Sequence, residues 1–284
     1  MVKCIKLNNQ VEMPMEGFGV FQVTDARLCS KAVAEAIETG YRLIDTASSY
    51  GNEEAVGLAI RESSVPREEL FVTTKAYIQQ MGYENTRKAF QESLEKLGLE
   101  YLDLYLIHMP FGDYYGSWRA MEDLYREGKV RSIGVSNFLP DRLMDLCYNA
   151  RILPAVNQLE CHPHYQREEE LVLMEELGIK VQAWAPFAEG HNDIFNNEIL
   201  KSIANKYKKT VPQVIIRWQI QRGIVTIPKS TKKERIVENF NIFDFELSNE
   251  DMELISTINT GKSTFFDLRT PEMVEAIANL KRNV

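Results

Sequence analysis

The sequence predicts an α/β fold, and within that class a closed, parallel (β/α)8 barrel. Eight short segments rich in Val, Ile, Leu, Tyr and Phe recur along the 284 residues, and each precedes a longer segment with the apolar spacing of a helix. The segments end about 24 to 43 residues apart, and a βαβ unit needs ~30. The length is a little above the ~250 residues of a typical barrel. An open doubly wound sheet is the alternative, but the sequence lacks the GxGxxG fingerprint of a dinucleotide-binding sheet.

The elements follow in order along the chain. Strands are expected at residues 17–21, 42–45, 70–75, 101–108, 131–136, 155–160, 180–184 and 224–227. Two helices are well marked, because residues 25–39 stop at Gly40 and residues 84–97 stop at Gly98, and glycine is common just past a helix end. The long interval before the last strand leaves room for an extra helix near residues 198–207.

Both ends of the chain extend beyond the eight units. Residues 1–13 are expected to form a hairpin across the bottom of the barrel. Residues 249–284 are expected to form a helix followed by an aromatic tail. No linker-like segment divides the chain, so we expect one continuous domain over residues 1–284.

The composition is acidic, with 33 Lys+Arg against 41 Asp+Glu and a net charge of −8. This balance argues against nucleic acid and against an anionic membrane as partners. No apolar run approaches the ~20 residues of a membrane span, and the first residues lack the apolar stretch of a signal peptide. The four scattered cysteines suggest free thiols in a reducing compartment. We therefore expect a cytoplasmic protein that is a monomer or a weak oligomer.

Polar residues end three consecutive strands whose interiors are largely apolar. Asp45 ends the second expected strand, Lys75 the third and His108 the fourth. In a barrel the carboxyl ends of the strands form the active site, so these side chains should meet at one mouth. Tyr50, five residues after Asp45, can fold over the same mouth. Each residue alone has an ordinary structural interpretation, but together they are costly to bury unless they serve one another or a ligand.

These four residue types suit proton transfer by a phenol. A free tyrosine has a pKa of ~10, and an adjacent ammonium group should lower it. Lys75 would supply that charge, Asp45 would hold Lys75 protonated, and His108 would hydrogen-bond a carbonyl oxygen beside the Tyr50 hydroxyl. No residue of the sequence can supply a hydride, so a nicotinamide cofactor is required.

Three ordered motifs resemble the signatures of one family. Residues 40–57, residues 133–138 and residues 227–235 are similar to the first, second and third signatures of the aldo-keto reductases. The resemblance covers essentially the whole chain, in the branch of 2,5-diketo-D-gluconate reductase and prostaglandin F synthase. It implies NADP(H), bound in an extended conformation without a Rossmann domain. It also implies a catalytic tetrad of Asp45, Tyr50, Lys75 and His108.

The resemblance further implies which residues hold the cofactor. Ser136, Asn137 and Gln158 match positions that hydrogen-bond the nicotinamide carboxamide, and Trp184 matches the residue on which the ring stacks. The other implied positions are Pro186, Phe187 and Glu189 over the pyrophosphate, Lys229, Ser230, Lys232 and Arg235 at the phosphates, and Glu238 and Asn239 near the adenine. A barrel commonly places its phosphate site after the last strands, which supports the basic segment as that site.

Some positions depart from the family pattern. Met109 follows His108 where most relatives of this branch have Trp, and flexible Met reshapes the pocket wall. Lys232 stands where Arg is usual, and Glu189 places a negative charge near cofactor phosphates. The apolar substrate pocket is expected to be lined by Phe21, Tyr50, Tyr77, His108, Met109 and Phe111, with Phe265, Phe266 and Leu268 of the tail closing it.

The leading function is therefore NADPH-dependent reduction of small aldehydes and ketones, and three alternatives remain. A cofactor-sensing regulatory subunit with the same fold and little turnover is the main one. The cluster Cys161-His162-Pro163-His164 suggests a metal, but it has no second group of ligands at a suitable spacing, so no metal is expected. A glycosidase pair could be composed from Glu53 and Glu160, but both positions resemble structural residues of the family.

Overall fold

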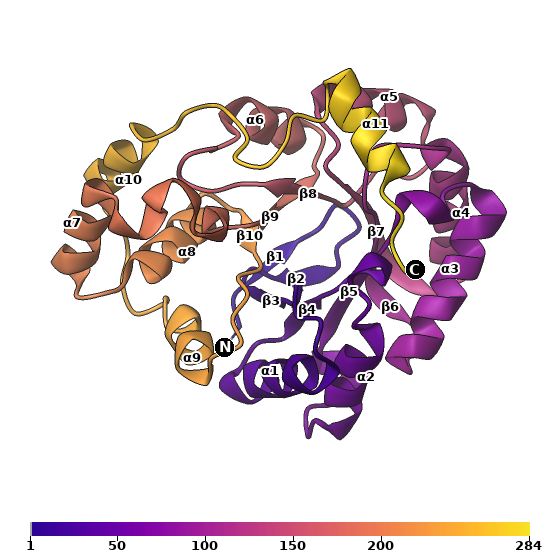
Figure 1. Ribbon diagram of the computed structural model, residues 1–284, viewed down its shortest axis with the longest axis horizontal. Helices are drawn as coiled ribbons and strands as arrows, with labels where there is room; N and C mark the ends of the chain where they lie inside the picture. Colours follow the sequence, from indigo (N-terminus) through magenta and orange to yellow (C-terminus); the bar gives the residue numbers. More distant parts are fainter. Residues whose placement is uncertain (1) are drawn as a thin grey trace.

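The computed structural model describes residues 2–284, and within them eight parallel strands form a barrel wrapped by helices (Figure 1). The strands pair in chain order from β3 to β10, and a parallel bridge between Glu16 and Thr226 joins the two ends of the sheet. Their bounds are β3 Gly17–Gly19, β4 Leu43–Asp45, β5 Phe71–Ala76, β6 Leu102–Ile107, β7 Val130–Ser136, β8 Val156–Glu160, β9 Lys180–Trp184 and β10 Val225–Thr226. The predicted fold class is confirmed.

The helices lie outside the strands, and capping residues fix their ends. Asp25 accepts a hydrogen bond from the Leu28 backbone N–H at 2.8 Å, and Gly40 ends the same helix with a φ of 126°. The helices are α1 Ala26–Thr39, α2 Glu53–Glu62, α3 Tyr83–Leu97, α4 Tyr114–Arg126, α5 Pro140–Asn149, α6 Glu168–Glu176, α7 Glu198–Tyr207, α8 Val211–Gln221, α9 Lys233–Phe240, α10 Asn249–Ser256 and α11 Pro271–Asn279. The extra helix expected before the last strand is α7.

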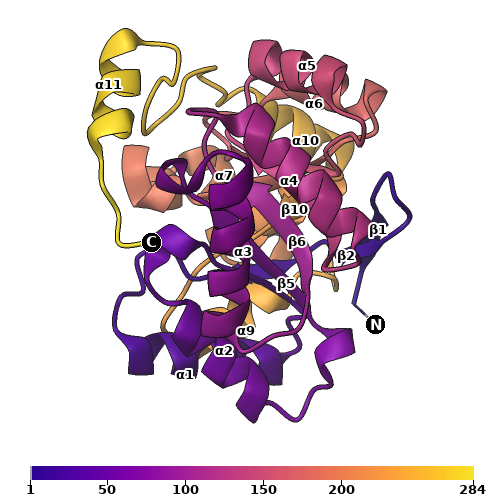
Figure 2. The same ribbon diagram turned by 90° about the vertical axis from the view of Figure 1, so that its right-hand side faces the viewer.

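The N-terminal hairpin and the C-terminal segment lie at opposite ends of the barrel (Figure 2). The hairpin pairs β1 Cys4–Lys6 with β2 Glu12–Pro14. In its turn, Asn8 donates to the Pro154 carbonyl and Asn9 donates to the Arg131 carbonyl, each at 2.9 Å. These two carbonyls lie at the amino ends of β8 and β7, so the hairpin closes the bottom of the barrel as predicted.

Two apolar layers hold the barrel together. Inside it, Leu43, Phe71 and Leu104 pack with Met13 of the hairpin in one buried cluster. A larger cluster fills the space between the strands and the helices, and Trp118 is among its largest fully buried side chains. The rigid strand ends above these layers are therefore a stable base for a site.

Two details differ from the sequence-based expectations. The first and last barrel strands are shorter than predicted, because β3 ends at Gly19 and β10 has only two residues. The tail carries a second helix, α11, in addition to the expected α10.

None of the helices described between residues 2 and 284 is long and apolar enough to cross a membrane.

Candidate active site

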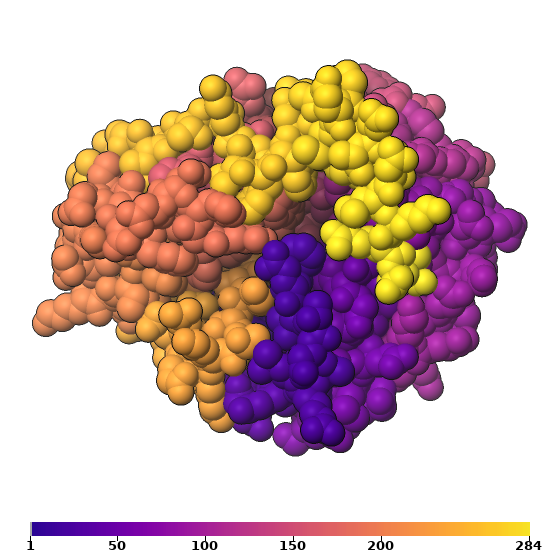
Figure 3. Space-filling view, in the orientation of Figure 1, coloured from indigo at the N-terminus to yellow at the C-terminus, as the bar shows by residue number. Residues whose placement is uncertain are grey.

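A cavity of about 1160 Å³ opens at the carboxyl ends of the strands. It is visible as the hollow between the N-terminal, orange and yellow parts of the surface in Figure 3. Three of the four residues expected to act in catalysis, Asp45, Tyr50 and His108, line it. The fourth, Lys75, lies directly behind them with its side chain fully buried.

Lys75 and Asp45 form a buried ion pair. The Lys75 ammonium nitrogen Nζ lies 2.5 Å from Asp45 Oδ1 and also donates to the Thr46 carbonyl at 2.7 Å. Burial raises the pKa of Asp45 and lowers the pKa of Lys75, and the attraction between the two opposes both shifts. The short contacts therefore hold the ammonium group at a fixed position behind Tyr50.

Tyr50 reaches the site from the short 3-10 helix η1 Ser48–Tyr50, which follows β4. Its hydroxyl oxygen lies 3.5 Å from Lys75 Nζ, which is long for a hydrogen bond. Burial raises the pKa of Tyr50 well above its usual value, and the Asp45 carboxylate acts in the same direction. The lowering of the Tyr50 pKa that was expected from Lys75 is therefore not found, because burial of the hydroxyl dominates and the Asp45 carboxylate adds to it.

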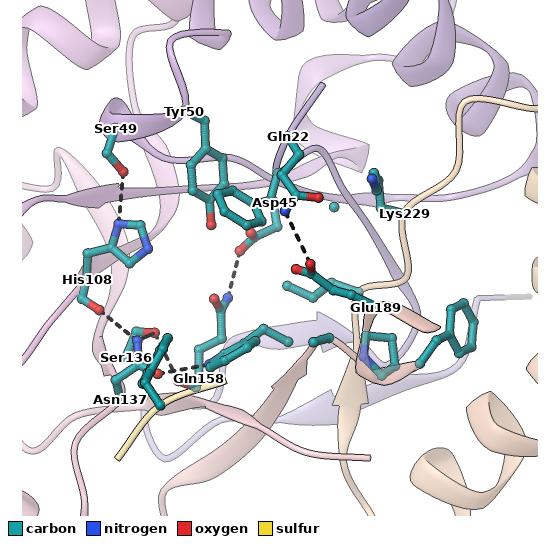
Figure 4. A pocket seen from close by; sticks show the side chains of 18 of the residues that line it. Gln22, Asp45, Ser49, Tyr50, His108, Ser136, Asn137, Gln158, Glu189 and Lys229 are labelled. Carbon is teal, nitrogen blue, oxygen red and sulfur yellow. Dashed lines mark hydrogen bonds between the residues drawn. The ribbon is translucent and has the colours of Figure 1, made fainter. Parts of the chain in front are cut away.

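His108 lies beside Tyr50 in the cavity (Figure 4). Their ring centroids are 5.6 Å apart, and His108 Nδ1 lies 3.3 Å from the Ser49 hydroxyl oxygen. Burial lowers the pKa of His108 well below its usual value, and the positive charges of Lys75 and Arg282 lower it further. The imidazole is therefore neutral near pH 7. A Ser49 hydroxyl that donates to Nδ1 leaves the ring proton on Nε2.

A connected group of polar residues lies at the ends of β7, β8 and β9, below Tyr50 and His108 in Figure 4. Gln158 uses both protons of its amide nitrogen, donating to Asp45 Oδ2 and to Gln182, each at 2.8 Å. Its amide oxygen is left to accept from a ligand. Ser136 donates to the Gln158 carbonyl at 2.9 Å, and Trp184 donates to Asn137 Oδ1 at 2.9 Å.

The basic segment after β10 lines the far end of the cavity. Lys229, Ser230 and Arg235 lie there with Glu238 and Asn239 of α9. Within residues 2–284, neither Lys229 nor Arg235 belongs to an ion pair, so both cations can meet an anionic ligand. Lys232 is not among the residues that line the cavity. It is exposed and stands at the first turn of α9.

The loop after β9 covers the middle of the cavity. Pro186, Phe187 and Glu189 line it, as expected for a loop over a bound dinucleotide. Gln22, which the sequence analysis did not single out, donates from Nε2 to Glu189 Oε2 at 3.2 Å (Figure 4). Residues far apart in the chain thus join the two sides of the cavity, and no local sequence signal marks that contact.

The apolar walls differ in part from the expected set. Phe21, Tyr77 and Met109 line the cavity, but Phe111 packs behind them instead. Phe265 and Phe266 of the tail lie against Trp184, with centroid distances of 5.3 and 5.8 Å. The sequence analysis missed the tail residues that complete this end of the cavity, which are Met273, Ala276, Ile277, Leu280 and Arg282.

The residues considered for a metal or for glycosidase chemistry have structural contacts. Glu160 accepts hydrogen bonds from the Ser263 hydroxyl at 2.5 Å and the Thr264 backbone N–H at 2.8 Å. His162 Nε2 lies 2.9 Å from the same carboxylate. Among residues 2–284, no group of three or more His, Cys, Asp and Glu side chains could hold a metal ion.

Comparisons with known proteins show the family of this chain. The aldo/keto reductase family matches residues 17–260. A glyoxal reductase of Bacillus subtilis is 52% identical over 256 residues, covering 90% of this chain and 92% of the relative. An aldo-keto reductase from a Medee basin deep-sea metagenome is 49% identical with a TM-score of 0.91, over 94% of this chain and 98% of its own. A Bombyx mori aldo-keto reductase in complex with NADP is 38% identical with a TM-score of 0.88, over 92% and 94%.

The barrel with polar residues at its strand ends defines the class, an NADP-dependent oxidoreductase that reduces carbonyl groups. The chain belongs to the aldo/keto reductase family, as its sequence motifs predicted. Its cofactor is NADP(H).

The residues of the cavity fit this cofactor. The volume of about 1160 Å³ exceeds the roughly 300 to 1,000 Å³ of ordinary ligand pockets, which suits a dinucleotide together with a substrate. Lys229 and Arg235 offer positive charge at one end, and the Gln158 amide oxygen offers an acceptor near Tyr50 at the other. An extended molecule with phosphates at one end and an amide at the other matches this spacing of groups.

Proposed function

We propose that the chain reduces small aldehydes and ketones to alcohols, with NADPH as reductant and Tyr50 as the proton donor. The observation that carries this proposal is that Tyr50 and His108 lie next to each other in one cavity, with the Lys75–Asp45 pair directly behind. A carbonyl oxygen beside the Tyr50 hydroxyl and His108 Nε2 would meet two hydrogen-bond donors. Such groups, aimed at an oxygen that gains negative charge, lower the barrier of the reaction.

Each residue has a defined part in the proposed reaction. NADPH, when bound, supplies the hydride that adds to the carbonyl carbon. Tyr50 is protonated near pH 7, because burial raises its pKa, and it donates that proton to the carbonyl oxygen. The Lys75 ammonium stabilises the charge that Tyr50 then carries. Neutral His108 orients the carbonyl by donating from Nε2.

The relatives suggest small substrates. Proteins similar to this chain are named glyoxal reductase in Bacillus subtilis and methylglyoxal reductase in Escherichia coli, the latter 40% identical over 261 residues. The largely apolar walls from Phe21, Tyr77 and Met109 suit such small carbonyl compounds. The four cysteines are free thiols, which supports the proposed cytoplasmic location.

The test is the substitution Tyr50→Phe, which removes the transferable proton and keeps the ring. General acid catalysis contributes ~10²- to 10⁴-fold, so kcat for simple aldehydes should fall at least 100-fold. NADPH binding, followed by quenching of protein fluorescence, should stay near wild type. Tyr83→Phe is the matched control, because the Tyr83 hydroxyl bonds Asp123 outside the cavity.

Two results would contradict the proposal. A Tyr50→Phe protein with near wild-type kcat would exclude Tyr50 as the proton donor. Wild-type protein that stops after about one equivalent of NADPH per site, with every simple aldehyde offered, would favour the cofactor-sensing subunit instead.

A further inference from the structure

The C-terminal segment brings a positive charge to the reacting end of the cavity. After α11 the chain runs down one side of the barrel mouth to the C-terminus, as the yellow segment of Figures 1 and 3 shows. Arg282 on this segment lines the same cavity as Tyr50 and His108. The apolar side chains of Tyr77, Met109 and Ile277 form a cluster beside it, together with Val284. Arg282 therefore belongs to the substrate end of the cavity and not to the basic segment after β10.

Two hydrogen bonds to the Gln79 side chain hold the backbone of Arg282 in place. The Arg282 backbone N–H donates to Gln79 Oε1 at 2.6 Å, and Gln79 Nε2 donates to the Arg282 carbonyl at 3.0 Å. The next residue, Gln80, accepts from the Ser48 hydroxyl at 2.7 Å, and that hydroxyl lies 2.9 Å from the Lys75 carbonyl. The segment is thus tied to the same loops that position Tyr50 and Lys75.

The charge of Arg282 has no partner in the described part of the chain. Within residues 2–284, no carboxylate lies within 4.0 Å of its guanidinium group. The Asp45 carboxylate, which lines the same cavity, is already paired with Lys75. The positive charge of Arg282 lowers the pKa of both Tyr50 and His108, so its field reaches the place where a carbonyl would react. An arginine that lines a ligand pocket without an ion-pair partner suits a carboxylate, which its guanidinium group can bind through two parallel hydrogen bonds.

We propose that Arg282 binds the carboxylate of a substrate whose aldehyde or ketone lies between Tyr50 and His108. The preferred substrates are then carboxylated aldehydes, with apolar atoms between the two groups to contact Tyr77, Met109 and Ile277. This inference rests on the proposed reductase function, because it assigns a substrate class to the same site.

The test compares matched charged and neutral substrates. Wild-type protein reduces 4-carboxybenzaldehyde and its neutral isostere 4-carbamoylbenzaldehyde, and the ratio of their kcat/KM values is measured. A charge-assisted contact at a partly exposed site is worth roughly tenfold or more in this ratio. Arg282→Gln should abolish the preference, Arg282→Lys should restore part of it, and Arg282→Glu should reverse it. Lys281→Gln is the matched control, since Lys281 is exposed and does not line the cavity.

A binding measurement keeps the inference separate from catalysis. Calorimetry on the protein–NADP⁺ complex should show that 4-(hydroxymethyl)benzoate binds about tenfold more tightly than 4-(hydroxymethyl)benzamide, and that Arg282→Gln removes the difference. A ratio near one in wild type, or the same ratio in Arg282→Gln, would overturn the inference while leaving aldehyde reduction intact. An Arg282→Gln protein with a raised KM for NADPH and an unchanged substrate ratio would assign Arg282 to the cofactor instead. If no aldehyde is reduced, the reductase proposal fails, and the calorimetry still decides whether Arg282 binds a carboxylate.

Discussion

The Lys75–Asp45 pair shows how strongly one residue depends on another in this site. Both side chains are almost fully buried, and removing one partner of such a pair typically costs about 3 to 5 kcal/mol of stability. Substitution of Lys75 would therefore alter folding and catalysis together. The loss of a single hydroxyl in Tyr50→Phe leaves the pair intact, which makes it the cleaner test of proton transfer.

Arg235 should set the preference for NADPH over NADH. It lines the far end of the cavity, and the 2′-phosphate of NADPH carries nearly two negative charges that NADH lacks. A charge-assisted hydrogen bond contributes roughly 1.5 to 3 kcal/mol, or about tenfold to a hundredfold. Arg235→Ala should raise KM for NADPH by about that factor and change KM for NADH much less. Added salt should weaken the NADPH preference of the wild type first.

Lys232→Ala is the matched control for this prediction. The family resemblance implied a place for Lys232 at the phosphates, but in the structure Lys232 is exposed and does not line the cavity. Its removal should change the preference far less than removal of Arg235. Equal effects of Arg235→Ala on both cofactors, or a larger effect from Lys232→Ala, would show that the adenosine end has been assigned incorrectly.

At the scale of whole elements, the tail depends on one buried carboxylate. Glu160 at the end of β8 accepts two hydrogen bonds from residues 263 and 264, and the next two residues pack on Trp184. Glu160→Gln keeps the shape of the side chain but turns one acceptor into a donor that faces other donors. We expect a loss of about 1 to 3 kcal/mol in the free energy of unfolding and a several-fold rise in KM for aldehydes.

A variant of a second buried carboxylate distinguishes the loss of stability from the rise in KM. Glu122 on α4 accepts from the backbone N–H groups of Arg151 and Ile152 at 2.6 and 2.9 Å, and it does not line the cavity. Glu122→Gln should cost a similar free energy, measured by urea unfolding, with no change in KM. If Glu160→Gln alters stability alone, the tail does not shape the substrate site.

The tail contains the features of the fold that the sequence did not predict. Every barrel strand was predicted, because each is a short apolar run whose register brings the polar strand ends to one mouth. Helix α11 was not predicted, although Thr270 at its start and Pro271 at its first position are ordinary helix signals. The position of Arg282 had no local signal at all, since it depends on the contact with Gln79, which is 203 residues away.

Loops account for the other differences in the site. Phe111 and Lys232 follow the expected strands closely, yet turns direct them away from the cavity. Gln22 and Asn137 have positive φ angles of 64°, a conformation that no spacing of apolar residues predicts. Strand periodicity thus located the residues that end strands, and the family resemblance located Tyr50 and the loop after β9, while the place of Gln22 needed the structure.

At the scale of the whole molecule, closing the barrel buries a carboxyl group at its base. The backbone of Glu16 pairs with that of Thr226 where the first and last strands meet, and Glu16 is only 2% exposed. Burial raises the pKa of Glu16 well above its usual value. The folded protein therefore holds a proton there that the unfolded chain releases above pH ~4.5.

The sign of the pH effect follows from this difference in protons. A group whose pKa is raised in the folded state contributes its full stability below the unfolded pKa, and that contribution is lost as pH rises toward the folded pKa. Between the unfolded and the folded pKa, each rise of one pH unit lowers the free energy of unfolding by up to about 1.4 kcal/mol through Glu16. Glu16→Gln has the same shape and no proton to lose, so this slope should vanish in the variant.

Urea unfolding at pH 5, 6, 7 and 8 measures the effect. The difference in free energy of unfolding between Glu16→Gln and wild type should grow with pH in favour of the variant, because the wild type alone pays for keeping its proton. Taking the difference between the two proteins cancels the contributions of the groups that they share. These include His108, whose lowered pKa makes stability rise with pH. Glu12→Gln, on the exposed edge of β2, is the matched control. Parallel stability curves for Glu16→Gln and wild type would mean that Glu16 is ionised in the folded barrel, and that closing the sheet at Thr226 does not desolvate it.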